Sequence, residues 1–172
     1  MLILVAARAL REHPECNVRL LRDSTVSPHT VNIGLALDTE RGLLVPVIRD
    51  AQKMSLRGIA ETTARLIKQA RTGKINPDEL RGSTFIVTNL GKYEIDAFTP
   101  IIKPPESAIL GAGRIVAKQV VTDRKAGKVA IRDMVFLSLT FNHRIIDVVP
   151  AARFLQKVKL YIEKPYLWLA GT

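Results

Sequence analysis

The sequence has one cysteine, Cys16, few aromatic residues and no long apolar run. A single cysteine excludes an internal disulfide and is typical of a protein in a reducing compartment, so we expect a cytoplasmic protein. No segment reaches the roughly 20 apolar residues that a membrane-spanning helix needs, and we therefore predict no membrane insertion. We interpret Cys16 as a buried, unreactive thiol rather than a nucleophile.

Acidic residues are also scarce, with 16 of them against 26 basic residues and a net charge of +10. Such a balance indicates an anionic partner, which could be nucleic acid, a polyanionic cofactor or an acidic protein. The basic residues are scattered rather than interleaved with aromatic residues, and no zinc-finger, helix-turn-helix or RNA-recognition pattern is present. We therefore predict no nucleic-acid binding, and the other two kinds of partner stay open.

Apolar residues make up 47% of the 172 residues and charged residues 24%, which is typical of one folded domain spanning 1–172. Apolar spacing predicts helices over 2–12, over about 55–74 and from Asp147 to about 164, with Ser55 and Asp147 as N-caps. We predict strands over 18–21, 31–37, 43–48, 84–87, 108–113, 115–121 and 129–141. Strands in runs between a few long helices predict an α/β two-layer sandwich, a mixed β-sheet with helices packed on one face.

The first candidate for chemistry is the segment Asn142-His143-Arg144-Ile145-Ile146-Asp147. A histidine titrates near neutral pH, so His143 at the end of a strand can accept and return a proton. A carboxylate such as Asp147 can fix the tautomer of an imidazole and stabilise its protonated form. The spacing alone leaves open a histidine that only packs in the core and an aspartate that only caps a helix.

The second candidate is the segment Gly82-Ser83-Thr84-Phe85-Ile86-Val87-Thr88-Asn89-Leu90-Gly91. Thr88 lies where a β-branched strand ends, and its hydroxyl could donate a hydrogen bond to a developing oxyanion in an acyl-transfer reaction. The alternative is an ordinary turn, because Asn and Gly both favour turns.

Together, "RGSTFIVTNLG", "FTPIIKPPESAILGAGRI" and "SLTFNHRIID" resemble the catalytic domain of 2-oxoacid dehydrogenase acyltransferases. "AARALREHPECN" and "VNIGLALDTERGLLVPVIRDAQKMSLRGIAE" are similar to the same family, in the same order. The resemblance implies a chloramphenicol-acetyltransferase-like fold and a homotrimer with active sites between subunits. It also implies an acyltransferase that moves an acyl group between dihydrolipoyl and coenzyme A thiols, with the lipoyl group supplied in trans.

By this resemblance His143 matches the catalytic histidine, Asp147 the aspartate of the HxxxDG motif, and Thr88 the hydroxyl residue that stabilises the tetrahedral intermediate. The positions that match coenzyme A contacts are Asp38, Thr88, Asn89, Gly113 and Ile115. No residue is assigned to a metal. The implied partners are lipoyl domains, other dehydrogenase-complex subunits and a larger cubic or dodecahedral core, in which the apolar segment 165–172 would dock on a neighbouring trimer. The alternative is that this segment packs on its own subunit.

Three departures from the family pattern favour a second interpretation. Asn142 stands where the family has an aspartate, which removes a charge, and Val148 stands where it has a glycine. If that position needs positive φ or a close backbone approach, the β-branched valine is expected to strain the loop and to displace Asp147. Relative to the family, the fold lacks its first helix and strand, and the lipoyl and subunit-binding domains have no counterpart. The alternative is therefore a catalytically degenerate core or scaffold subunit that assembles without turnover. A chloramphenicol-type acetyltransferase is a third possibility in the same fold.

Overall fold

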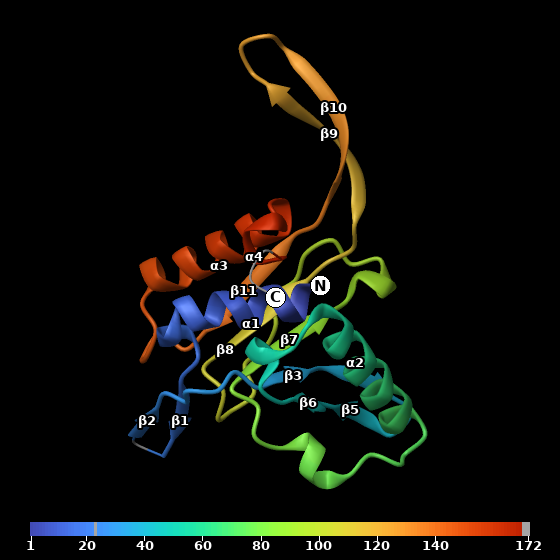
Figure 1. The fold of residues 1–172 in the computed structure, drawn as a ribbon, viewed down its shortest axis with the longest axis vertical. Coiled ribbons are helices and arrows are strands. Elements are labelled where there is room, and N and C mark those ends of the chain that lie inside the picture. The colour runs from blue at the N-terminus through green and yellow to red at the C-terminus, as the bar shows by residue number, and fades with distance from the viewer. Residues whose placement is uncertain (23, 170–172) are drawn as a thin grey trace.

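A computed structural model describes residues 1–22 and 24–169 of the chain (Figure 1). The α-helices are α1 (Leu2–Glu12), α2 (Leu56–Arg71), α3 (Val148–Glu163) and the short α4 (Tyr166–Leu169). Short 3-10 helices are η1 (Pro14–Cys16), η2 (Ala51–Lys53), η3 (Pro77–Leu80) and η4 (Gly91–Tyr93). The strands are β1 (Arg19–Leu21), β2 (Ser24–Val26), β3 (Ile33–Leu35), β4 (Leu37–Thr39), β5 (Gly42–Leu44), β6 (Val47–Ile48), β7 (Phe85–Asn89), β8 (Ala108–Ala112), β9 (Val116–Asp123), β10 (Lys128–Met134) and β11 (Leu137–Phe141).

Five strands form the main sheet in the order β11-β8-β7-β3-β6. The central strands β3, β7 and β8 are parallel, and the two outer strands are antiparallel to their neighbours. The remaining strands form three two-stranded ribbons, of which β9–β10 projects far from the body of the molecule (Figure 1). The predicted mixed sheet is thereby confirmed.

The helices α1, α2 and α3 bury their apolar residues in one core against one face of this sheet. Phe154 of α3 lies edge-on to Phe85 of β7, with ring centroids 5.4 Å apart, and both side chains are fully buried. On the opposite face, Val45, Ile86 and Ile109 form a much smaller cluster. The predicted arrangement of helices on one face of the sheet is therefore confirmed.

The cap of α2 was predicted correctly, and its end was placed three residues too late. The Ser55 hydroxyl accepts a hydrogen bond from the Gly58 N–H at 3.1 Å. The helix ends at Arg71, and Gly73 then adopts φ +68, a left-handed conformation that glycine reaches at little cost. The pattern of apolar residues could not locate this end, because residues 71–74 contain no apolar side chain that would distinguish a helix from a loop.

Three predicted strands are each divided in the structure. The segment 129–141 consists of β10 and β11, since the chain leaves the ribbon partner β9 after Met134 and pairs with β8 from Leu137. The segment 31–37 divides at Ala36 into β3 and β4, and 43–48 divides before β6. Alternating hydrophobicity reports which face a side chain occupies, so it does not reveal where a strand changes its partner. Strand β2 was not predicted, and all three of its residues are exposed.

Cys16 is fully buried, and burial followed by the nearby Glu15 carboxylate raises the pKa of its thiol to about 12. Only about one thiol in ten thousand would then be ionised at pH 8, and the thiolate is the reactive form. We expect native protein to resist iodoacetamide at pH 8, whereas protein unfolded in guanidinium reacts fast. Labelling followed by mass spectrometry checks this, and equal rates in the two states would contradict the burial.

The apolar segment that begins at Pro165 divides between buried and exposed residues. Trp168 is buried on its own subunit, and its Nε1 donates a hydrogen bond to the Tyr161 carbonyl at 2.8 Å. Tyr166, Leu167 and Leu169 remain exposed. Residues 170–172, which the predicted docking segment includes, lie outside the described residues. No helix in the described ranges is long and apolar enough to cross a membrane.

Candidate active site

His143 lies on a tight turn that follows β11. The Asn142 N–H donates to the Ser107 carbonyl at 2.8 Å, which fixes the start of the turn to the sheet. The Asn142 carbonyl accepts from the N–H groups of Ile145 and Ile146, both at 3.0 Å. The exposed His143 ring contacts the Phe141 ring, with centroids 5.9 Å apart. The imidazole is thus presented to the surface on a well-supported backbone.

The departure at Asn142 has a clear structural role. Its side-chain oxygen accepts a hydrogen bond from the Arg144 N–H at 3.0 Å, which closes an Asx turn around His143. An aspartate carboxylate could accept the same bond with the same geometry. The substitution therefore removes a charge and preserves the contact that shapes the turn.

Asp147 occupies the N-cap position of α3, as predicted, but its side chain makes no cap hydrogen bond. That part of the prediction was wrong, and the residue is exposed to solvent. Among the described residues no hydrogen bond joins Asp147 to His143. Val148 is the first residue of α3 and has no positive φ, so the condition under which positive φ would strain this residue is not met.

Thr88 and Asn89 end strand β7, where they pair with Gly111 and Ala112 at the end of β8. Thr88 is half-buried, and no described residue forms a hydrogen bond with its hydroxyl. The Asn89 side-chain oxygen accepts from the Gly91 N–H at 2.7 Å, so Asn89 does have the turn role that was the alternative. The free hydroxyl of Thr88 remains available to a ligand.

The other predicted coenzyme A positions lie near this same end of the sheet. Asp38 of β4 accepts a hydrogen bond from the Tyr93 hydroxyl at 3.1 Å, and Tyr93 follows β7 in η4. The N–H of Gly113, just after β8, donates to the Phe136 carbonyl at 3.0 Å, and Ile115 is exposed two residues later. The structure thus gathers Asp38, Thr88, Asn89, Gly113 and Ile115 at one end of the sheet.

Sequence reasoning missed three polar residues at this end. Tyr93 holds Asp38, and Arg114 forms an exposed ion pair with Asp96. The hydrogen bond from Arg114 holds the pKa of the Asp96 carboxyl below its usual value. The sequence carries no spacing signal for these contacts, because they join a loop to a strand end 18 or more residues away.

His143 lies at the other end of the sheet from Thr88. Phe141, two residues before the histidine, pairs with Ala108 at the start of β8, whereas Thr88 pairs with Gly111 near its end. At a rise of about 3.3 Å per residue and a strand spacing of about 4.8 Å, the two residues are separated by more than about 10 Å. His143 and Thr88 therefore do not meet within one chain.

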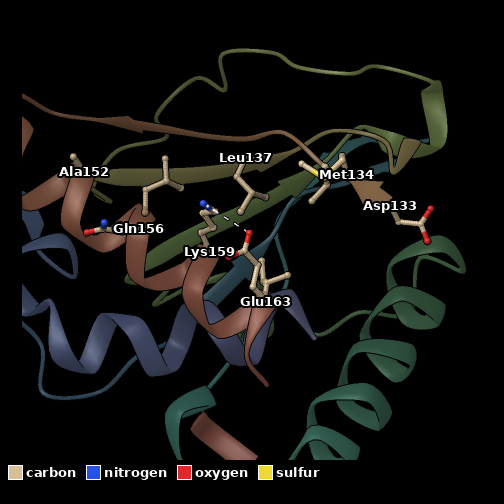
Figure 2. A pocket seen from close by; sticks show the side chains of 10 residues that line it. Asp133, Met134, Leu137, Ala152, Gln156, Lys159 and Glu163 are labelled. Carbon is tan, nitrogen blue, oxygen red and sulfur yellow. Dashed lines mark ion pairs between the residues drawn. The ribbon is translucent and has the colours of Figure 1, made fainter. Parts of the chain in front are cut away.

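Two cavities of the described part of the chain contain no predicted site residue. The larger, of about 450 Å³, lies between β10, β11 and α3 (Figure 2). The smaller, of about 280 Å³, is lined by Arg8, Arg11, Glu12, Tyr161, Leu167 and Trp168. Among the described residues, no group of three or more His, Cys, Asp and Glu side chains could hold a metal ion.

A substitution at Gly113 tests how closely the end of β8 packs against the backbone of residues 95 and 96. A Cβ at this glycine would lie 1.7 Å from the backbone oxygen of Asp96, a distance that no rotamer change can relieve. We expect Gly113→Ala to displace the 95–96 loop and to destabilise the protein by about 1–3 kcal/mol. Chemical denaturation measures this. Gly127→Ala is the control for a mutated glycine with open space around it, although its positive φ adds a small strain. Equal stability of Gly113→Ala and wild type would contradict the packing.

Residues 1–170 match the family 2-oxoacid dehydrogenases acyltransferase (catalytic domain), and the chain belongs to this family. This chain is 42% identical over 161 residues to the dihydrolipoyllysine-residue acetyltransferase component of the acetoin cleaving system of Bacillus subtilis. That match covers 93% of this chain and 39% of the relative. It is 43% identical over 157 residues to the succinyltransferase component of the 2-oxoglutarate dehydrogenase complex of Rickettsia conorii, covering 91% of this chain and 39% of the relative. The chain thus spans about two fifths of these relatives.

Solved structures agree with the family assignment. A probable dihydrolipoamide acetyltransferase from Listeria monocytogenes superposes with a TM-score of 0.89 at 36% identity, covering 95% of this chain and 68% of that one. The cubic core of a pyruvate dehydrogenase multienzyme complex gives 0.86 at 37% identity, covering 92% and 65%. Chloramphenicol acetyltransferase, at 0.58 and 18% identity with 92% and 74% covered, shares the fold. In the Azotobacter vinelandii enzyme, the residues studied in catalysis are a serine, a histidine and an asparagine four positions after it.

Proposed function

We propose that this chain is the catalytic core of a dihydrolipoyl acyltransferase in a 2-oxoacid dehydrogenase complex. The observation that carries the proposal is an exposed histidine, held on a rigid turn at one end of the sheet, in a chain of this family. Asp147 follows His143 at the same spacing of four residues as the asparagine in the Azotobacter vinelandii enzyme. We further propose that Thr88 takes the part of that enzyme's serine.

The reaction follows from the chemistry of thiols. A thiol with a pKa of about 8.5 is mostly protonated at pH 7, and only the thiolate is a good nucleophile. His143 takes the proton from the coenzyme A thiol, and the sulfur forms a bond to the carbonyl carbon of the acyl-lipoyl thioester. The Thr88 hydroxyl donates a hydrogen bond to the oxyanion. The intermediate then breaks its bond to the lipoyl sulfur, which receives the proton from His143.

A complete site requires more than one copy of the chain in this proposal. His143 and Thr88 lie at opposite ends of the sheet, so His143 of one copy would meet Thr88 of a second. A closed ring of such heterologous contacts gives a trimer, on which a larger cubic or dodecahedral core can build. The similarity to the cubic core of a multienzyme complex supports this assembly.

Coenzyme A would bind at the end of the sheet that carries Asp38, Thr88, Asn89, Gly113 and Ile115. The net charge of +10 suits its phosphates and acidic partner subunits. Lipoyl groups would be supplied in trans by lipoyl domains, in a cytoplasmic complex. The exposed side chains of Tyr166 and Leu167 would contribute to contacts between trimers.

The shared site predicts a specific rescue. His143→Ala and Thr88→Ala chains are each expected to be nearly inactive when expressed alone. Co-expressed in equal amounts, they should recover about a quarter of wild-type activity, because a random partner supplies each intact side chain half of the time. Native mass spectrometry would show that mixed trimers form. Mixed trimers without any recovered activity would contradict a site built from two copies.

The activity itself is tested on the wild-type protein. Acetyl-, succinyl- and branched-chain acyl-coenzyme A would each be supplied with dihydrolipoamide, and the acylated product measured beside light scattering for mass. We expect transfer from one preferred donor and the mass of a trimer or its multiple. Trimers that bind coenzyme A without transferring any acyl group would instead identify a scaffold subunit.

A further inference from the structure

The smaller cavity, of about 280 Å³, lies between the second half of α1, the last turn of α3 and the short helix α4. Helix α1 contributes Arg8, Arg11 and Glu12 to its lining. Trp168 of α4 forms a fixed wall, because this side chain is buried and its Nε1 donates a hydrogen bond to the Tyr161 carbonyl at 2.8 Å. Helices α1 and α3 pack on each other beside the pocket (Figure 1). The cavity therefore places two guanidinium groups next to a rigid aromatic surface.

Glu12, the acidic residue of this lining, is already neutralised by the rest of the chain. Its carboxylate forms an ion pair with Lys157 of α3, with 2.7 Å between Nζ and Oε2, and accepts a hydrogen bond from the Tyr161 hydroxyl. Burial, followed by the Glu12 carboxylate, raises the pKa of that hydroxyl to about 12, so it stays a donor at neutral pH. Glu12 and Lys157 cancel in charge, and the positive charges of Arg8 and Arg11 are left over.

Neither of these two arginines pairs with a carboxylate in the part of the chain that the structure describes. The Nε atom of Arg8 is buried and has no hydrogen-bond partner among the described residues. A buried charged donor without an acceptor is costly to a fold. Arg11 lies in the last turn of α1, where a cation suits the helix dipole, but Arg8 lies one turn earlier and has no such role. Arg8 therefore offers a desolvated donor to a ligand.

The pocket's shape and lining select the class of ligand. Two guanidinium groups one helical turn apart favour an oxyanion, since each presents a planar set of donors to carboxylate or phosphate oxygens. A lone phosphate, only a few water molecules in size, would fill a small part of the cavity and leave Leu167 and Trp168 without a contact. A carboxylate on a short carbon chain satisfies both the charged and the apolar part of the lining.

We propose that this pocket binds a carboxylate carried on a short carbon chain, with the oxygens on Arg8 and Arg11 and the carbon atoms against Leu167 and Trp168. The carboxylate belongs either to a free acid or to an acidic side chain of a partner polypeptide, because both present the same group. This site is separate from the acyl-transfer chemistry, since none of the proposed catalytic residues lines the pocket.

Trp168 is the one tryptophan of the sequence, so its fluorescence reports on the pocket directly. The probe is glutarate, titrated into the full chain at constant ionic strength, and its uncharged diamide is the matched control. Glutarate should change the emission of Trp168 with half-saturation below about 10 mM, and the diamide should not. Inorganic phosphate that binds as tightly as glutarate would contradict the assignment to a carboxylate.

A third titration, with a capped oligoglutamate peptide, distinguishes the two sources of the carboxylate. Tighter binding of the peptide than of glutarate would identify an acidic polypeptide as the ligand. Tighter binding of glutarate would identify a free acid. Both results support a carboxylate site, and competition between the two ligands would show that they share this pocket.

Two substitutions test the arginines separately. Arg8→Lys keeps the positive charge but loses the planar set of donors, and Arg11→Gln removes a charge from an exposed position, where folding should be unaffected. Each should raise the half-saturating concentration of glutarate by about tenfold. Arg57→Gln is the matched control, since it removes an exposed arginine from α2, which does not line the pocket. Circular dichroism checks that all three variants fold.

The proposal is overturned if Arg8→Lys and Arg11→Gln both bind glutarate as wild type does. It is also overturned if glutarate produces neither a change in Trp168 emission nor heat of binding in calorimetry of the wild-type protein. His143→Ala should bind glutarate as wild type, which keeps this result distinct from the outcome of the acyl-transfer assay.

Discussion

Replacing His143 with alanine is expected to lower kcat for acyl transfer by about a hundred- to ten-thousand-fold, the usual contribution of a positioned general base. The coenzyme A thiol would then lose its proton only to solvent, and the fraction of thiolate at pH 7 is small. The KM for coenzyme A should change little, because the proposed binding residues lie at the other end of the sheet in each chain. Steady-state kinetics with dihydrolipoamide and acyl-coenzyme A measures both quantities.

Because His143 is exposed, the His143→Ala variant should remove the imidazole without changing the stability of the fold. Truncating an exposed side chain creates no cavity, so stability should change by no more than about 0.5 kcal/mol. Arg144→Ala is the matched control, since it removes an exposed cation from the same turn and keeps the backbone bond to Asn142. A His143→Ala enzyme with near wild-type kcat would eliminate the imidazole as the base and leave the scaffold interpretation.

The second large effect concerns stability and rests on Phe154. This ring is fully buried where α3 meets the sheet, and it contacts the rings of Phe85 and His13 edge-on. Phe154→Ala should lower the free energy of unfolding by about 3–5 kcal/mol, from lost burial and the cavity left behind. Because α3 follows directly from the His143 turn, loss of activity should accompany the loss of folded protein. Urea denaturation followed by circular dichroism measures the change.

Val149→Ala provides the comparison for Phe154→Ala. Val149 belongs to the same helix and is 58% exposed, so its truncation should change stability by no more than about 0.5 kcal/mol. Similar losses for the two variants would indicate that α3 does not pack on the sheet through Phe154. A loss below about 1 kcal/mol for Phe154→Ala would lead to the same conclusion.

The sequence predicts the sheet, its helices and the location of the histidine because each depends on local patterns. Helix α1 was placed at the observed boundaries, since its apolar spacing is strong and His13-Pro14 ends it. His143 was placed after a strand that the structure contains. The separation of His143 from Thr88 could not be read from the chain, because it depends on β11 running antiparallel to β8 while β7 runs parallel to it.

The strain expected at Val148 shows where reasoning from a motif fails. A glycine in a family pattern indicates positive φ, close approach or neither, and the sequence does not distinguish among these. Here the backbone is already helical at Val148, a conformation that any residue adopts. The capping bond expected of Asp147 failed for a different reason. The residue type and position are correct for a cap, but the side chain of Asp147 forms no hydrogen bond with the first turn of α3.

The pairing of α1 with α3 has a consequence for how the protein is made. These two helices pack on each other and on the same core, yet one is built from the first residues of the chain and the other from residues 148–163. During synthesis, Leu4, Val5 and Leu10 leave the ribosome long before Phe154 and Val158 exist to cover them. A nascent chain that exposes the apolar face of a helix is prone to aggregate or to bind chaperones. The yield of folded protein from bacterial expression should therefore rise when translation is slowed or when chaperones are abundant.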